Sequence, residues 1–419
     1  MIFPQLDYLG LDINKSDFWK VHLINTYGKR TKEIVNKVCL DYNIKNTTLN
    51  EDGLIYLLQK THILRYVHIN GTIEKSNLFE LLTSILFALF LSGEENEIVI
   101  NKKILTKNFY VLDGTNLCFD FSYKHEETIS FIPQENNIKC GLHSIKMLPN
   151  EKNFVFEKSN EFFYSLPYDS DTGFIFFFIE TDADEQSYDR YLLESVSDIK
   201  TEIEVIKRCK EEIFLINPNI WSNILQHITY ISFTMLDGFE SSTDPRELRN
   251  SIIINMRLTK GMNKLEKIAW AANGLYHESK HNQYVDTVFF EIPPYETKKE
   301  YKSVFEIQEK SVVAPWKGLP QNRTLTQILL GMHAFVPGLY ICFKILIQEK
   351  NKPLSLWLKG RIEEEMRSIN GTVSIMLLSE AYLNKDGITL SNRLIEDFFN
   401  YLSPTYNELV FCRKEIEKN

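Results

Sequence analysis

The sequence lacks any pair of cysteines at C-x-x-C spacing, although six cysteines are scattered over its 419 residues. This excludes a zinc ribbon and indicates no disulfide framework, so we expect reduced, buried thiols. Basic residues are not in excess either, because 47 Lys and Arg stand against 56 Asp and Glu, which leaves a net charge of -9. That balance argues against a nucleic-acid partner.

Long apolar runs are also missing. The N-terminus has neither the basic nor the apolar region of a secretory signal, and the longest apolar run, residues 85–91, is much shorter than the roughly 20 residues that cross a bilayer. We therefore expect a soluble, cytoplasmic protein without a membrane partner. Residues 85–91 are expected to lie in a buried core helix.

The chain is 44% hydrophobic and long enough for two domains. Its patterns predict an α+β fold. Residues 1–165 are predicted to form an N-terminal accessory region, in which helices precede a small antiparallel sheet. Residues 166–419 are predicted to form a mainly helical metal-binding part with a mixed sheet.

The pattern with the clearest chemistry is the H-E-x-x-H motif formed by His277, Glu278 and His281. Apolar residues recur at helical spacing before it, which predicts a helix, and residues four apart in a helix lie on the same face. The two imidazoles can therefore bind one metal ion. We expect the helix to end soon after His281, because polar residues interrupt the pattern and residues 285–290 have the β-branched and aromatic composition of a strand.

A catalytic metal ion usually has three protein ligands and open positions, so a third ligand is needed. Thr324 and Gln327 have the spacing of a capping box that opens an apolar helix, and His333 lies within that helix. A histidine on an apolar helix is more often a core residue, but the incomplete site favours His333 as a ligand. The preceding stretch contains Trp316 and Arg323 among turn-forming residues, which suits either the lining of a pocket or a plain surface loop.

Three segments together, residues 274–281, residues 315–317 with Arg323, and residues 330–336, resemble a known family. This family comprises the HExxH-motif peptide-modification proteins found near ribosomally made natural-product precursors, whose members are similar to iron- and 2-oxoglutarate-dependent peptide β-hydroxylases. The resemblance covers residues 205–401. The family commonly has Arg directly after the Trp and Pro directly after the second Arg, whereas this chain has Lys317 and Thr324, which affects substrate placement more than metal binding.

The resemblance implies an Fe(II)- and 2-oxoglutarate-dependent oxygenase, with O₂ as co-substrate, that hydroxylates a side-chain β-carbon of a ribosomally synthesised precursor peptide. It implies that His277, His281 and His333 bind the metal ion. Arg323 would clamp the distal carboxylate of 2-oxoglutarate, with Trp316 also at the cofactor site. Glu278 would either orient a ligand or coordinate the metal directly.

Two other interpretations remain open. A zinc metallopeptidase would use Glu278 as the general base, with Glu291 or Glu296 as a third zinc ligand. The metzincin continuation is missing, because Tyr284 and Thr287 stand where it requires Gly and His. The chain could also be a non-catalytic peptide-binding protein. Because the N-terminal region has no chemical motif, we expect it to support the catalytic part or to contribute to peptide recognition.

Overall fold

The computed structural model describes residues 9–11, 18–61, 64, 67, 73, 75–105, 109–122, 126–147, 154–155, 162–179, 196–234, 242–243, 249–255, 259–288, 305–316, 321–348 and 352–402. The chain forms two compact units, and each is built from segments that are distant in the sequence. One unit comprises Met1–Asp17, Lys200–His227 and Leu258–Asn419, and the other comprises Phe18–Ile199 and Ile228–Arg257. The described residues combine helices with several small antiparallel and mixed sheets, so the predicted α+β class is confirmed.

The unit that begins at residue 18 opens with helices and continues with sheets. Its helical elements are α1 (Phe18–Asp41), α2 (Glu51–Lys60), the short η3 (Lys75–Asn77) and α4 (Leu78–Leu91). Residues 85–91 lie in α4, and the side chains of residues 85–90 are buried as predicted. Helix α2 begins at the cap residue Asn50, whose side chain accepts a hydrogen bond from the backbone of Gly53.

Antiparallel strands follow these helices and form two sheets. One sheet has the order β1-β4-β5-β6-β7 and the other has the order β2-β3-β8. Their bounds are β1 Asn96–Asn101, β2 Phe109–Val111, β3 Leu117–Asp120, β4 Glu126–Ile132, β5 Asn137–Cys140, β6 His143–Met147, β7 Phe154–Val155 and β8 Phe163–Ser165, with the short helix η4 at Pro133–Glu135. The predicted antiparallel sheet is therefore present, divided between two sheets.

A third sheet in the same unit is mixed, as predicted for this part of the chain. Its order is β12-β13-β11-β10-β9, in which β10, β11 and β13 are parallel and the edge strands are antiparallel. The strands are β9 Tyr168–Asp169, β10 Phe174–Ile179, β11 Tyr230–Thr234, β12 Ser242–Thr243 and β13 Ser251–Asn255. The three parallel strands are rich in Ile and Phe, and their described side chains (174–177, 230–234 and 251–255) are buried, which is typical of parallel sheets.

The predicted boundary between residues 165 and 166 falls inside this unit. A buried cluster explains why strands on both sides of that boundary belong together, because it joins Cys118 of β3 to Ile175 and Phe177 of β10 and to Tyr230 of β11. The Tyr230 hydroxyl also receives a hydrogen bond from the backbone of Thr115, 3.0 Å away. Contacts of this kind, between residues more than 100 positions apart, have no local sequence signal.

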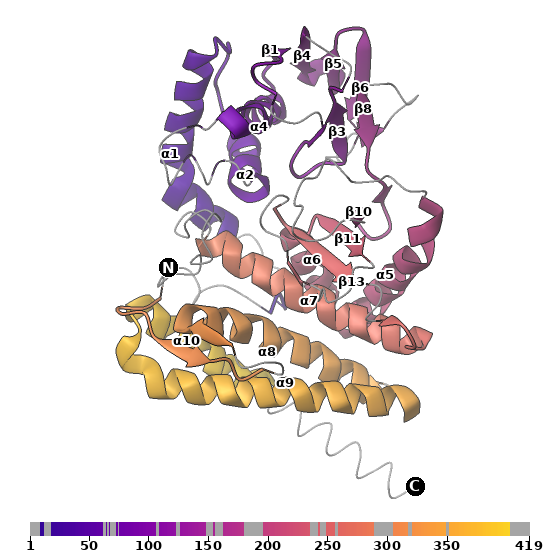
Figure 1. The fold of residues 1–419 in the computed structure, drawn as a ribbon, viewed down its shortest axis with the longest axis vertical. Coiled ribbons are helices and arrows are strands. Elements are labelled where there is room, and N and C mark those ends of the chain that lie inside the picture. The colour runs from indigo at the N-terminus through magenta and orange to yellow at the C-terminus, as the bar shows by residue number, and fades with distance from the viewer. Residues whose placement is uncertain are drawn as a thin grey trace, which may run out of the picture. The chain divides into compact units, whose positions relative to one another are not determined.

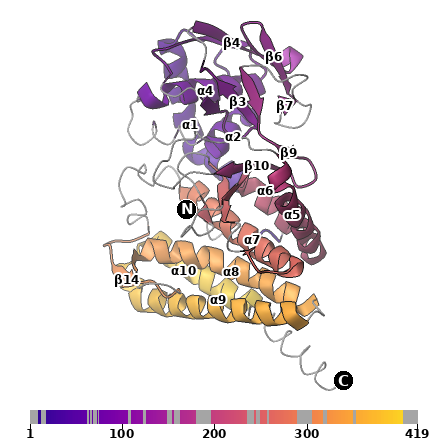
Figure 2. The same cartoon turned by 45° about the vertical axis from the view of Figure 1, so that its right-hand side comes forward.

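The other unit is almost entirely helical and carries all the predicted site residues. Its elements are α5 (Val196–Ile216, which begins just before the unit's Lys200–His227 segment), α6 (Pro218–His227), α7 (Lys264–Val288), the hairpin of β14 (Ser311–Val313) and β15 (Asn322–Thr324), α8 (Leu325–Gln348), α9 (Lys352–Ser379), η7 (Glu380–Tyr382), α10 (Lys385–Asp397) and η8 (Phe398–Leu402). Helices α8 and α9 lie side by side in both views (Figure 1 and Figure 2). The 18-residue apolar window within Leu325–Ile347 of α8 is hydrophobic enough to cross a membrane, but 83% of it is buried within the protein.

The predicted end of the helix that carries His277 and His281 is wrong. Helix α7 does not end after His281 but continues to Val288, so residues 285–288 are helical and the predicted strand at 285–290 is not formed there. The polar residues that suggested a break, including Asn282 and Gln283, are buried against other parts of the unit.

The described cysteines are free and buried, as the sequence predicts. Cys39, Cys118, Cys140, Cys209 and Cys342 are free and buried, as expected for reduced thiols, and Cys412 lies outside the described residues. Burial raises the pKa of the Cys39 thiol to about 11.

The start of α8 is fixed by two sets of hydrogen bonds. The predicted capping box is present: the Thr324 amide donates to the Gln327 side chain over 3.0 Å, and the Gln327 amide donates to the Thr324 hydroxyl over 3.3 Å. The buried carboxylate of Glu306 accepts hydrogen bonds from the amides of Leu325 and Thr326, each 3.3 Å away. A carboxylate at a helix N-terminus also interacts favourably with the helix dipole.

We predict that Glu306→Ala lowers the free energy of unfolding by about 3 kcal/mol, because it leaves helix N-terminal amides buried without their acceptor. Glu309→Ala is the matched control, because Glu309 is exposed on the same segment and its loss should change stability by less than about 0.5 kcal/mol. Urea unfolding followed by circular dichroism measures both. Equal effects of the two substitutions would contradict the role assigned to Glu306.

Candidate functional site

One face of α7 is fixed by contacts with α6 and with residues 9–11. The Tyr276 hydroxyl donates a hydrogen bond to the carbonyl of Leu9, and the Lys280 ammonium donates to the side chain of Asn223. The same ammonium lies 4.9 Å from the centre of the Tyr276 ring, within cation–π range. These contacts set the rotation of α7 and therefore the direction in which His277 and His281 point.

The same face carries a buried His–Asp pair near the end of α7. His227 Nδ1 lies 2.9 Å from Asp286 Oδ2, and both side chains are almost fully buried. The residues are 59 positions apart, so the sequence patterns gave no indication of the pair. The pair helps to hold the end of α7 in place past His281, because Asp286 has its partner within the buried interior.

A neighbouring face of α7 packs antiparallel on α8. Near the end of α7, the Tyr284 hydroxyl donates to the carbonyl of Thr326, at the start of α8. Further back, the Asn273 amide nitrogen lies 3.3 Å from the Cys342 sulfur, more than halfway along α8. The interface between these two contacts contains the predicted ligands from both helices.

His277 and His281 are close together on this face. Their ring centroids are 4.7 Å apart and the ring planes are at 82°. A metal–nitrogen bond of about 2.1 Å puts a ring centroid about 3.2 Å from the ion, so two imidazoles that bind one ion with an angle of about 90° at the metal have centroids about 4.6 Å apart. Both side chains are partly exposed, whereas their Nδ1 atoms are inaccessible to solvent. The pair fits the binding of one metal ion.

His333 lies on α8 at the same interface and is 1% exposed. Its Nε2 is 3.2 Å from Gln283 Oε1, and its ring centroid is 5.7 Å from that of Tyr284. His333 is therefore held one helical turn beyond His281 along α7. Within the described ranges, no three His, Cys, Asp or Glu side chains stand close enough together to bind a metal ion as placed.

All three histidines are neutral at pH 7. Burial lowers the pKa of His277 well below its ordinary value, and the charges of His281 and Arg361 lower it further. Burial alone lowers the pKa of His281 to about 4. For His333, burial is again the main cause of a much lowered pKa, followed by the charge of Lys280. The neutral imidazole is the form that binds metal ions.

Trp316 connects the loop before α8 to the histidine pair. Its ring centroid is 5.8 Å from that of Phe335, and the Phe335 centroid is 5.1 Å from that of His277. A Cβ at Gly331 would stand 3.0 Å from the Trp316 ring, so only glycine lets the indole approach α8 this closely. Three segments that are well separated in the sequence thus meet beside His277.

Of the other predicted residues, Arg323 and Glu278 lie within the described part of the chain. Arg323 lies on β15 and donates a hydrogen bond to the side chain of Gln321 in the same hairpin. About 12 Å of helix separates the start of α8 from His333, so Arg323 is at the Tyr284 end of the interface. Glu278 is buried on α7 at 8% exposure. Lys317, Glu291 and Glu296 lie outside the described residues.

A buried polar cluster beside His277 was not predicted. Asn273 donates a hydrogen bond to Glu365 of α9 over 3.1 Å, and Arg361 forms an ion pair with the same carboxylate at 3.0 Å. Burial raises the Glu365 pKa to about 6 against the lowering effect of Arg361. In the sequence, Arg361 and Glu365 stand in a charged run that resembles a solvated helix face. Only the tertiary packing shows that Glu365 is 1% exposed.

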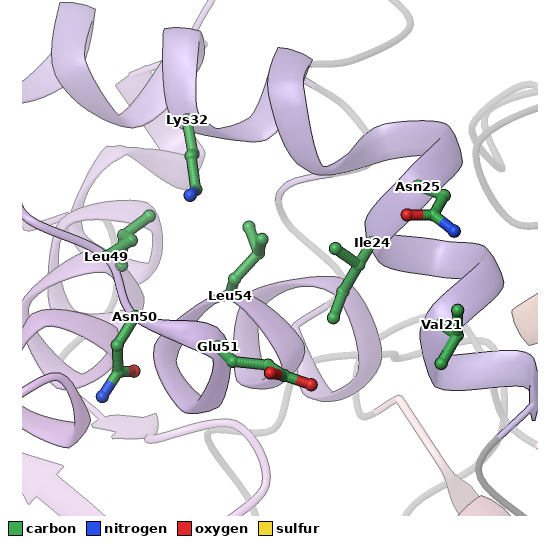
Figure 3. A pocket seen from close by; sticks show the side chains of 8 residues that line it. All are labelled: Val21, Ile24, Asn25, Lys32, Leu49, Asn50, Glu51 and Leu54. Atoms are coloured by element: carbon green, nitrogen blue, oxygen red, sulfur yellow. The ribbon is translucent and has the colours of Figure 1, made fainter.

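A groove of about 400 Å³ occurs in the other unit, between α1 and α2 (Figure 3). It combines apolar side chains with the charged Lys32 and Glu51, and it contains none of the predicted site residues. Its lining residues are Val21, Ile24, Asn25, Lys32, Leu49, Asn50, Glu51 and Leu54.

Comparison of the chain with protein-family models gives no match, and comparison with curated protein sequences gives none either. The assignment of function therefore rests on the motif residues and on the arrangement of α7, α8 and α9.

The histidine pair leads to a prediction about acid stability in the metal-free protein. His281 has a pKa of about 4 when folded and an ordinary value of 6.5, so the unfolded chain binds more protons between these values. The free energy of unfolding should be retained above pH 6.5 and fall as the pH drops toward 4. In His281→Gln, the slope of the free energy of unfolding against pH should be smaller, because up to about one proton fewer is taken up on unfolding. Urea unfolding from pH 4 to 7 tests this, and identical slopes for both proteins would contradict it.

Proposed function

We propose that the protein is an Fe(II)- and 2-oxoglutarate-dependent oxygenase that hydroxylates a side-chain β-carbon of a ribosomally synthesised precursor peptide. The observation that carries this proposal is the convergence of three separate motifs beside one histidine pair. His277 and His281 stand at a separation that suits one metal ion, and Trp316 packs next to them through Phe335. The resemblance of the same motifs to peptide β-hydroxylases supplies the reaction class.

In this proposal, His277, His281 and His333 hold the metal ion, and two-histidine sites with open positions are typical of non-haem iron oxygenases. When bound, Fe(II) with 2-oxoglutarate supplies O₂ activation, with 2-oxoglutarate converted to succinate and CO₂ and one oxygen atom transferred to the peptide. His333 ligates only if its Nε2 exchanges Gln283 for the metal ion. The low pKa values of the histidines support the proposal, because none must lose a proton at pH 7.

The remaining residues bind 2-oxoglutarate, line the site or orient a metal ligand. Arg323 is the candidate clamp for the distal carboxylate of 2-oxoglutarate, since a guanidinium forms two parallel hydrogen bonds with a carboxylate. Trp316 and Phe335 form an apolar wall beside His277 that limits the access of water. Glu278 either coordinates the ion or orients a ligand. The cytoplasm, where iron(II) and 2-oxoglutarate are both present, is the compartment that this chemistry requires.

We predict a weak visible charge-transfer band when the protein is titrated anaerobically with Fe(II) and then with 2-oxoglutarate. His277→Ala and His333→Ala should abolish the band because each removes a metal ligand. Arg323→Ala should weaken the apparent affinity for 2-oxoglutarate by about 10- to 100-fold, the effect of losing a charge-assisted hydrogen bond. Arg367→Ala is the matched control, because Arg367 is exposed on α9 and distant in sequence from the motifs.

The other interpretations give different results in the same experiment. Tight zinc binding without a 2-oxoglutarate-dependent band would favour a metallopeptidase, whose product peptides would be shorter. If neither metal binds and His277→Ala changes nothing, the protein is a non-catalytic peptide-binding protein. A band that persists unchanged in His333→Ala would remove His333 from the ligand set.

A further inference from the structure

The carboxylate of Glu365 is held by one of its two oxygens. Oε1 accepts a hydrogen bond from Asn273 of α7 at 3.1 Å and pairs with Arg361 of α9 at 3.0 Å. Oε2 is inaccessible to solvent and has no hydrogen-bond partner within the described part of the chain. The two partners on Oε1 therefore fix the carboxylate and leave Oε2 as a directed acceptor.

Glu365 Oε2 and His277 Nδ1 face the same small space. A Cβ built on Gly338 of α8 would lie 3.5 Å from Glu365 Oε2 and 3.6 Å from His277 Nδ1. His277 Nδ1 is likewise inaccessible to solvent and lacks a hydrogen-bond partner among the residues that are described. The space exists because position 338 is glycine. Two buried polar atoms, Glu365 Oε2 and His277 Nδ1, thus flank one point beside α8.

The helix backbone contributes to this opening. Pro337 lies inside α8 and has no N–H, so it cannot make the usual helical hydrogen bond to the carbonyl of His333. Gly338 follows directly and presents no side chain toward α7. The two residues allow Asn273, His277 and Glu365 to approach the α8 backbone at one place.

A neutral imidazole carries its proton on one nitrogen and a lone pair on the other, and the neighbouring hydrogen bond decides which. We propose that Glu365 is a positioning residue whose Oε2 accepts the Nδ1 proton of His277, which turns the Nε2 lone pair toward the metal ion. This inference rests on the proposed metal centre. A carboxylate behind a metal-binding histidine fixes the tautomer and increases the basicity of the ligand, and its loss typically lowers metal affinity about 10- to 100-fold.

The tautomer of His277 can be measured without any metal. Protein labelled with ¹⁵N-histidine, with the His277 signal assigned by His277→Gln, should show the Nδ1–H form in a long-range ¹H–¹⁵N spectrum at pH 7.5. In Glu365→Gln, the amide N–H₂ can donate to an unprotonated Nδ1, so the Nε2–H form should predominate. An Nε2–H tautomer in the unmodified protein, or no change in Glu365→Gln, would overturn the proposal.

Co(II) affinity provides the second measurement. Glu365→Gln should weaken binding by about 10- to 100-fold and Glu365→Asp by less, because the shorter acid retains an acceptor. Glu364→Gln is the matched control: it removes the same charge from the adjacent position, where Glu364 lies 3.7 Å from Arg361, and should leave affinity and tautomer unchanged. Equal affinities for Glu365→Gln and Glu364→Gln would also contradict the proposal.

If the Glu365 variants do not fold, the proposal can be tested with a substitution that keeps every polar group. Gly338→Ala adds a methyl group 3.0 Å from Asn273 Nδ2, 3.5 Å from Glu365 Oε2 and 3.6 Å from His277 Nδ1, and this crowding should shift the tautomer and weaken Co(II) binding in the same direction. If the unmodified protein has the Nδ1–H tautomer but binds neither Co(II) nor Fe(II), the proposed oxygenase fails while the Glu365–His277 interaction stands. If it binds metal but has the other tautomer, only the present inference fails.

Discussion

The burial of α7 on two neighbouring faces is the constraint on which the rest of the helical unit depends. Polar side chains occur on both faces, and a buried polar group without a partner costs roughly 1–3 kcal/mol. Each face therefore recruits partners from distant segments: α6 and residues 9–11 on one side, and α8 and α9 on the other. Because these partners fix the rotation of α7 about its axis, they also fix the direction of His277 and His281.

The chemistry of the candidate site follows from this arrangement. Desolvation keeps the histidines neutral, while part of each ring in the His277–His281 pair remains exposed to solvent. The same burial would make an unpaired carboxylate at Glu365 unfavourable, and Asn273 and Arg361 offset that cost through one oxygen. The arrangement therefore brings neutral imidazoles, a buried carboxylate and two aromatic rings close together.

The helix boundaries show where local patterns mislead. The capping box at Thr324 and Gln327 is a local signal, because both of its hydrogen bonds join residues three positions apart, and it predicted the start of α8 correctly. The predicted end of α7 is wrong, because the polar residues after His281 interrupt the apolar pattern but not the helix. Asp286 is instead buried against His227, 59 positions away, and no periodicity within α7 could indicate that partner.

The sequence alone determined the α+β class, the helices that carry His277, His281 and His333, and the buried helix at residues 85–91, because each depends on local spacing and composition. Only the tertiary structure decided which segments form each unit, how close the histidines stand, and that Glu365 lies beside His277. The physical reason is that a charged residue in a helical run such as 361–367 has the same sequence pattern whether it meets water or a helix. Packing alone distinguishes the two, and packing is set by residues far away in the chain.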